Sequence, residues 1–240
     1  MTDLNTPDLN QLLNALPSPE YQRLQPYLEP IELRLGDVIY EPGDKLQHVY
    51  FPTTCIISLL YVMENGASAE IAVIGRDGMV GVALFMGGGS MPNRAVVQSA
   101  GHAFRLRAHL LMKEFNQFGP MLQILLRYTQ ALITQMAQTA VCNRHHTVDQ
   151  QLCRWLLLSL DRLPSNALNM TQELIANMLG VRREGVTEAA RKLQQAGLID
   201  YSRGHITILD RPGLEARVCE CYQVVKLESD RLFPPPPRRS

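Results

Sequence analysis

The spacing of apolar positions changes twice along the chain. Between residues 31 and 107, short apolar runs alternate with turns rich in glycine, asparagine and aspartate. Such a pattern is typical of an all-β sandwich or barrel. The predicted strands include Val49–Phe51, Ile56–Val62, Ala69–Ile74, Ala95–Gln98 and Ala103–Leu106.

Beyond about Leu110 the spacing becomes that of an α-helix. From Phe118 to Asn143, steps of three and four residues alternate, as in the heptad seam of a long helix. We assign this seam to a dimer contact through Leu122, Leu125, Thr129, Leu132, Met136, Thr139 and Asn143. The alternative is a core helix that packs on its own β-domain. A second stripe (Leu126, Ile133 and Ala140) leaves room for both contacts on one helix.

After a further predicted helix at Thr147–Leu163, residues 171–196 predict two helices joined by a tight turn. Thr171 is a suitable N-cap, and Gly180 can adopt the positive φ that ends a helix. The second helix buries Val186, Ala189, Ala190 and Leu193, and its other face presents Arg183, Thr187 and Arg191. This layout is typical of a recognition helix, because guanidinium and hydroxyl groups bind phosphates and base edges.

A short hairpin follows these two helices. Its predicted strands are Ile199–Tyr201 and Ile206–Ile208, with residues 202–205 at the tip. A hairpin in this place is a wing, which argues against the alternative of an ordinary αα-hairpin with a solvated face. The predicted DNA contacts are Thr171, Gln172, Arg182, Arg183, Glu184, Thr187, Glu188, Arg191, Arg203 and His205.

Composition limits the remaining possibilities. The chain has 23 basic and 23 acidic residues, so a DNA contact must come from a local patch. No run of about 18 apolar residues predicts a membrane span. The first residues lack the basic-then-apolar order of a signal peptide. Five scattered cysteines therefore indicate reduced thiols and a cytoplasmic protein.

Residues Thr171–Val186 closely resemble the helix-turn-helix of the Crp/Fnr regulators, and Gln151–Leu157 resembles the helix after their hinge. Leu35–Tyr40 and Pro42–Asp44 resemble parts of their cyclic-nucleotide-binding-type β-roll. The resemblance spans roughly residues 31–209. It implies a homodimeric, sequence-specific transcription regulator on a two-fold site in double-stranded DNA, with RNA polymerase as a further partner.

The expected fold class is α+β, with an N-terminal antiparallel, jelly-roll-like β-roll, a long dimerisation helix and a C-terminal winged helix-turn-helix. The expected boundaries are 1–30 for a helical lead-in, 31–117 for the sensor roll, 118–146 for the dimerisation helix and hinge, 147–226 for the DNA-binding domain and 227–240 for a disordered tail.

The chain departs from the family pattern in three places. Arg182 stands where many relatives have a serine cap, and Gly185 is a weak helix former in the first turn. Glu188 stands in place of a base-reading arginine. Its carboxylate would favour cytosine, repel a phosphate, or pair with Lys192 four residues later.

The third departure lies in the roll. Val82 occupies the place of the glutamate that holds the ribose, whereas Arg94 matches the arginine that holds the cyclic phosphate. The phosphate-binding residue of the family site is therefore kept and the ribose-binding residue is lost. We expect that the roll does not bind cAMP as nucleotide-binding relatives do. Arg94 would then bind another anion or form a salt bridge within the roll, and the effector is not identified.

No other group of residues in the sequence predicts a metal site or a catalytic site. On a helical reading of residues 215–225, the thiols of Cys219 and Cys221 would splay, and adjacent histidines such as His145 and His146 point apart. We therefore predict no metal and no cofactor. Without a nucleophile motif the chain is not expected to be an enzyme. The alternative function is a ligand- or partner-binding module whose helix-turn-helix no longer binds DNA.

Overall fold

The computed structural model describes residues 6–234 and begins with short helices. These are η1 (Pro7–Leu9), α1 (Gln11–Asn14), α2 (Ser18–Leu24) and η2 (Gln25–Tyr27). Asn10 caps α1 with its side-chain oxygen, and its amide nitrogen donates to the carbonyl groups of Pro52 and Gly78. The lead-in is thereby fixed to the domain that follows it.

Seven antiparallel strands form the β-roll. They are β1 (Glu29–Leu33), β2 (Val38–Tyr40), β3 (His48–Pro52), β4 (Ile56–Val62), β5 (Ser68–Ile74), β6 (Arg94–Ser99) and β7 (Gly101–Arg107), with helix η3 (Val82–Leu84) between β5 and β6. One sheet has the order β1-β7-β3 and the other β2-β6-β4-β5. The predicted strands are confirmed to within two residues at either end.

A long helix leads from the roll to the C-terminal part of the chain. After α3 (Ala108–Phe115), Pro120 stands at the first position of α4 (Pro120–His145), where its missing N–H costs nothing. One face of α4 packs on the roll through Met121, Ile124, Leu125 and Tyr128. The hydroxyl of Tyr128 donates to the carbonyl of Met79 at 2.7 Å, which ties this helix to the roll.

The remaining elements form the C-terminal domain, here called the head. They are α5 (Val148–Arg162), β8 (Ala167–Asn169), α6 (Gln172–Leu179), α7 (Arg183–Gln195), β9 (Ile199–Ser202), β10 (His205–Ile208), α8 (Arg211–Arg217) and α9 (Glu220–Leu232). Strand β8, which the sequence analysis missed, completes a sheet of order β8-β10-β9. The expected tail from residue 227 is wrong up to Leu232, because α9 continues there; residues 235–240 lie outside the described part.

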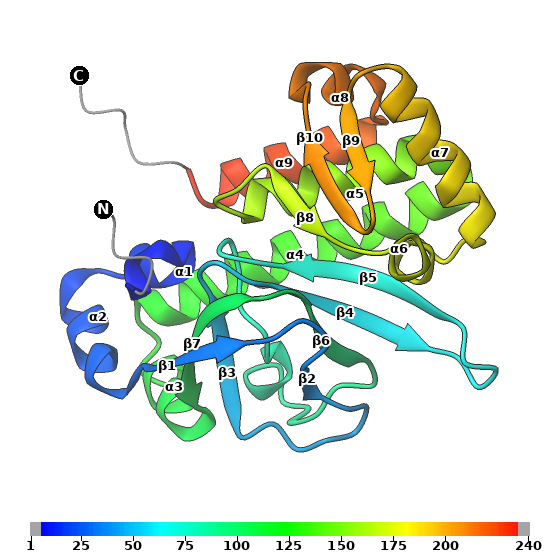
Figure 1. The fold of residues 1–240 in the computed structure, drawn as a ribbon. Helices are drawn as coiled ribbons and strands as arrows, with labels where there is room; N and C mark the ends of the chain where they lie inside the picture. The colour runs from blue at the N-terminus through cyan, green and yellow to red at the C-terminus, as the bar shows by residue number, and fades with distance from the viewer. Residues whose placement is uncertain (1–5, 235–240) are drawn as a thin grey trace, which may run out of the picture.

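The head lies against the roll, with α4 running between them (Figure 1). Ile56, Leu60 and Val73 of β4 and β5 share one apolar core with helices of the head. Helix α6 lies over β5, where a Cβ on Gly180 would come within 3.3 Å of Ala69. The roll and the head therefore form one packed body.

Buried polar groups cross this contact as well. Arg162 of α5 forms an ion pair with Asp77 of the roll at 2.7 Å and donates to Gln135 of α4 at 3.0 Å. Within the roll, on the sheet that faces the head, the hydroxyl of Ser58 on β4 hydrogen-bonds to the carboxylate of Glu70 on β5. Burial raises the pKa of Glu70 to about 7, although that hydrogen bond and nearby arginines act in the opposite direction. Within residues 6–234, no helix is both long and apolar enough to cross a membrane.

Candidate nucleic-acid interface

Helices α6 and α7 are held in a helix-turn-helix by local contacts. The hydroxyl of Thr171 accepts a hydrogen bond from the backbone N–H of Leu174 at 3.2 Å, which caps α6. Gly180 ends α6 with a φ of 65°, in the left-handed region that glycine adopts without strain. Helix α7 then begins after Arg182, whose side chain makes no cap hydrogen bond. Both the expected N-cap and the expected turn are confirmed.

The two faces of α7 differ as the sequence predicts. Val186, Ala189, Ala190 and Leu193 are buried against the rest of the head. The opposite face is exposed and carries Arg182, Arg183, Glu184, Thr187, Glu188 and Arg191. The hydroxyl of Thr187 donates to Gln172 of α6 at 2.6 Å, so the exposed polar groups of both helices meet on one surface.

The wing lies beside the start of α6. Its tip turns at Arg203 and Gly204, which both have a positive φ. Met170, just before α6, donates from its backbone N–H to the carbonyl of Gly204 at 2.7 Å, and Tyr201 donates to the carbonyl of Met170 at 2.8 Å. His205 is within 2.6 Å of Asn169 on β8. The missed strand β8 therefore fixes the wing relative to the helix-turn-helix.

These elements enclose an open hollow of about 480 Å³. Its lining residues are Thr171, Gln172, Glu173, Arg183, Tyr201, Arg203 and Gly204. Arg183 and Arg203 come from α7 and the wing, and Thr171, Gln172 and Glu173 come from the start of α6. Cations beside a helix N-terminus are favourable for an anion such as a phosphate group.

Glu188 lies on the exposed face of α7 and forms an ion pair. Lys192, one turn later, is 3.4 Å from Glu188 and 3.3 Å from Asp149 of α5. The hydrogen bond to Asp149 contributes most to a raised pKa of Lys192. The predicted pairing of Glu188 with Lys192 is therefore present in the described structure.

Two family models match the chain. A cyclic nucleotide-binding domain covers residues 30–118, and a Crp-like helix-turn-helix domain covers residues 150–217. The two domains stand in the order expected for the regulators that the sequence resembles. The chain belongs to the Crp/Fnr family of transcription regulators.

Solved structures of this family have the same fold. FixK2 from Bradyrhizobium japonicum is 17% identical, with a TM-score of 0.65 over 80% of this chain and 98% of its own. A CRP/FNR-family transcriptional regulator from Thermus thermophilus is 22% identical, with a TM-score of 0.61 over 78% of this chain and 97% of its own. The c-di-GMP-responsive global regulator CLP from Xanthomonas campestris is 15% identical, with a TM-score of 0.61 over 81% and 100%. A comparison with curated proteins gives no match.

Both candidate effector-binding residues of the roll make contacts within the chain itself. Arg94 donates through Nε and Nη2 to the carboxylate of Glu41, which raises the pKa of this arginine. Val82, on η3, is only 6% exposed and belongs to the core of the roll. Its side chain therefore presents little surface to a ligand. Of the two roles considered for Arg94, the salt bridge is the one present.

Part of the α4 seam that we assigned to a dimer contact faces the inside of the chain, and the second apolar stripe is exposed instead. Leu125 and Leu132 belong to the core with the roll, and Thr139 accepts a hydrogen bond from Arg154 of α5. These three residues pack within the chain, which corrects their assignment to a dimer contact. Of the other seam residues, Leu122, Thr129 and Met136 are half-buried and Asn143 is exposed. The large apolar residues that α4 exposes are Leu126, Ile133 and Val141, and Ala140 of the second stripe is exposed as well.

The cysteines near the C-terminus also differ from expectation. A break at Val218 separates α8 from α9, so Cys219 precedes α9 and Cys221 lies in its first turn. Their thiols do not splay but converge with Cys142 and His146 at the end of α4. The hydrogen bond with Cys142 lowers the pKa of Cys219 below its ordinary value. The argument against a metal from side-chain direction was therefore wrong.

Proposed function

We propose that this regulator binds specific DNA sequences as a homodimer, through the exposed face of α7 and the wing tip. The observation that carries the proposal is the hollow where Arg183, Arg203 and the start of α6 meet. Phosphate contacts there would set the register of the head on the DNA backbone. The face from Arg182 to Arg191 would then read base edges in the major groove.

A salt series on mixed genomic fragments tests this interface. We expect wild-type affinity to fall steeply with salt, because bound phosphates release counterions. Arg183→Ala should weaken binding by about ten- to a hundredfold. If its contact is to a phosphate, the variant should also reduce the salt slope by about one unit. Arg231→Ala on α9 removes one exposed arginine far from α7 and serves as the matched control, with unchanged binding expected.

Two results would favour the alternative of a ligand- or partner-binding module whose helix-turn-helix no longer binds DNA. One is the absence of DNA binding at low salt. The other is binding by Arg183→Ala that equals the wild type.

The homodimer is supported by the family, whose regulators act as dimers, and by the exposed apolar stripe of α4. A second copy that covers Leu126, Ile133 and Val141 would bring two heads to a two-fold site. We expect Ile133→Glu to shift the mass in solution from dimer to monomer, because it places a charge in this contact. Met63→Glu at the tip of the β4–β5 hairpin is the exposed apolar control. A wild type that is monomeric at micromolar concentration, with and without DNA, would contradict the dimer.

The roll, in this proposal, does not bind cAMP in the usual way. Glu41 already holds Arg94, and Val82 offers no acceptor for ribose hydroxyls. Calorimetry with cAMP and cGMP should give no binding heat, and tight binding of either would contradict this part. The proposal further includes RNA polymerase as a partner, a cytoplasmic location and action by binding rather than catalysis.

A further inference from the structure

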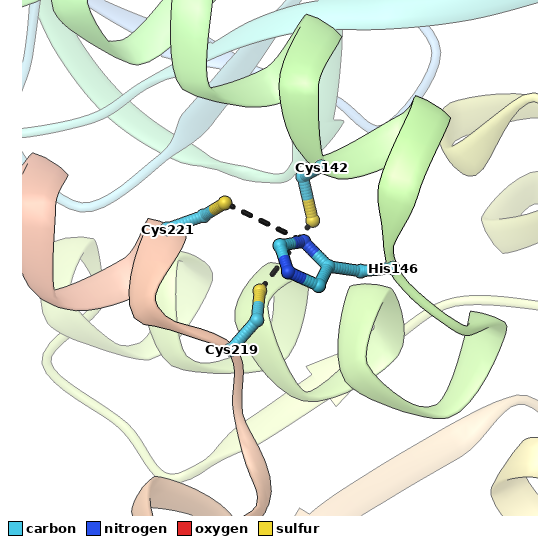
Figure 2. Close-up of side chains that lie close together, drawn as sticks. All are labelled: Cys142, His146, Cys219 and Cys221. Atoms are coloured by element: carbon cyan, nitrogen blue, oxygen red, sulfur yellow. Dashed lines mark hydrogen bonds between the residues drawn. The ribbon is translucent and has the colours of Figure 1, made fainter.

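Four side chains with metal-binding atoms meet where the end of α4 reaches the start of α9 (Figure 2). Their ligand atoms all lie within 4.8 Å of one another. The sulfur of Cys142 is 3.6 Å from that of Cys219, and the sulfur of Cys221 is 3.6 Å from Nδ1 of His146. Bonds of about 2.0–2.3 Å to a tetrahedral zinc ion give ligand–ligand distances of about 3.5–3.8 Å. These two distances match two of the six edges of such a tetrahedron.

We infer that Cys142, His146, Cys219 and Cys221 form a Cys3His site for one zinc ion. Thiolate and imidazole groups favour zinc and similar transition metals, whereas calcium and magnesium require oxygen ligands. A structural zinc site is closed by four protein ligands, and this group supplies four. The cysteines are free thiols, and a separation of 3.6 Å far exceeds the bond of about 2.05 Å in a disulfide.

The surroundings of His146 suit the role of a metal ligand. While Nδ1 faces the sulfur atoms, Nε2 lies 3.3 Å from a carboxylate oxygen of Glu220. Ligand histidines commonly donate their second ring N–H to a carboxylate, which fixes the tautomer and the direction of the ring. Glu220 is the residue between Cys219 and Cys221, so one short segment supplies two ligands and the group that orients a third.

Charge and access are also favourable. Three thiolates and one zinc ion leave a net charge of about −1 at the site. Arg154 is buried nearby and donates to Thr139, one turn before Cys142, while its Nε has no partner among residues 6–234. This positive charge favours the thiolate form of the ligands. The ligand group is not sealed, because the side chains of His146 and Glu220 are 15% and 76% exposed.

The position of the site gives it a mechanical consequence. His146 belongs to the short connection between α4 and α5, Cys219 is the N-cap residue of α9, and Cys221 lies in the first turn of that last helix. A zinc ion would cross-link the end of α4 to α9 and hold the head in the described arrangement. Because a metal that binds only the folded state stabilises it, zinc should raise the unfolding temperature of the chain.

Metal analysis of the full chain, purified under reducing conditions, tests the site. We expect about one zinc ion per chain. After removal of zinc by a chelator, Co2+ should produce the absorption bands of a tetrahedral thiolate complex, and added Zn2+ should abolish them. Cys142→Ser and Cys221→Ser should lose these bands. Cys55→Ser and Cys153→Ser, which alter buried cysteines outside the group, should keep them.

The cysteine variants could lose metal binding simply because they fail to fold. Glu220→Gln should still fold, because Glu220 is exposed and is not itself a ligand. We expect it to weaken metal binding by about 10- to 100-fold while the fold persists. The inference is overturned if the reduced wild type binds neither Zn2+ nor Co2+, or binds them as well after Cys142→Ser as before. It is also overturned if Cys142 and Cys219 are isolated only as a disulfide without metal. None of these readouts depends on DNA binding, so this site and the proposed function can fail separately.

Discussion

Charged side chains behave differently on the exposed surface of the head and at its contact with the roll. On the surface made by α6, α7 and the wing they are exposed, and Arg182, Arg183 and Arg191 form no ion pair within the described part of the chain. Where the head meets the roll, Arg162 and Glu70 are buried and take their partners from other elements of the same chain.

The two regions differ in the source of the hydrogen-bond and ion-pair partners of their polar side chains. At the buried contact, Asp77 pairs with Arg162 and Gln135 accepts a hydrogen bond from it, so these groups serve to hold the head on the roll. On the exposed surface, hydrogen-bonding capacity remains for an external ligand. Changes in the first region should therefore alter stability, and changes in the second should alter binding.

The largest effect is expected when the buried ion pair is broken. Arg162→Ala would leave Asp77 and Gln135 without their cation, and removal of one partner of a buried pair costs about 3–5 kcal/mol. Urea unfolding should therefore show a clearly lower midpoint. Arg231→Ala, which breaks an exposed pair with Glu228, is the control and should change the midpoint far less. Equal losses in the two variants would contradict the distinction between the regions.

Glu70 should make the stability of the chain depend on pH. Its pKa rises from an ordinary value of 4.5 to about 7 in the folded chain, where Arg154 and Arg162 face it. Between these values the folded chain retains a proton that the unfolded chain has released, so the free energy of unfolding falls as the pH rises. At about 1.4 kcal/mol per pKa unit, the fall amounts to a few kcal/mol.

Glu70→Gln stays neutral and should lack this dependence. The free energy of unfolding of the variant minus that of the wild type should therefore increase from about pH 4.5 to 7 and then level off, as measured by urea unfolding. Glu32→Gln removes an exposed carboxylate of β1 and controls for the loss of one acid. A constant difference between Glu70→Gln and the wild type would show that Glu70 is ionised throughout this range.

The smallest effect is expected at Glu188, on the exposed side of the comparison. Glu188→Gln should leave the unfolding midpoint unchanged, because the ion pair with Lys192 is on the surface. Base preference at one position of each half-site should change by about 1 kcal/mol, if the carboxylate accepts from cytosine. Competition between DNA sites that differ at single positions measures this change. An unaltered preference at every position would assign Glu188 to the pair with Lys192 alone.

Local patterns in the sequence predicted most of the fold and which face of α7 is exposed. Strand β4 is predicted to the residue, and the cap at Thr171 and the turn at Gly180 lie where expected, because neighbouring residues determine them. Strand β8 has only three residues, too few for a periodic signal, and it depends on pairing with β10. Whether such a segment forms a strand is decided by tertiary contact.

Two errors have the same physical origin. The apolar stripes of α4 were found, but periodicity does not say which stripe faces the chain's own roll. The cysteine group was missed because Cys142 and Cys219 are 77 residues apart and a helix boundary at Cys219 sets the direction of the thiols. Spacing along the chain does not contain this information.

The most direct test of the central claim is to determine which genomic fragments the purified protein selects, with Arg183→Ala analysed in parallel. The account predicts that wild-type protein enriches fragments with a two-fold motif. The two half-sites should lie about one helical turn apart, 10–10.5 base pairs or a multiple, and Arg183→Ala should lose the enrichment. Fragments without a shared motif, or equal enrichment by both proteins, would contradict it.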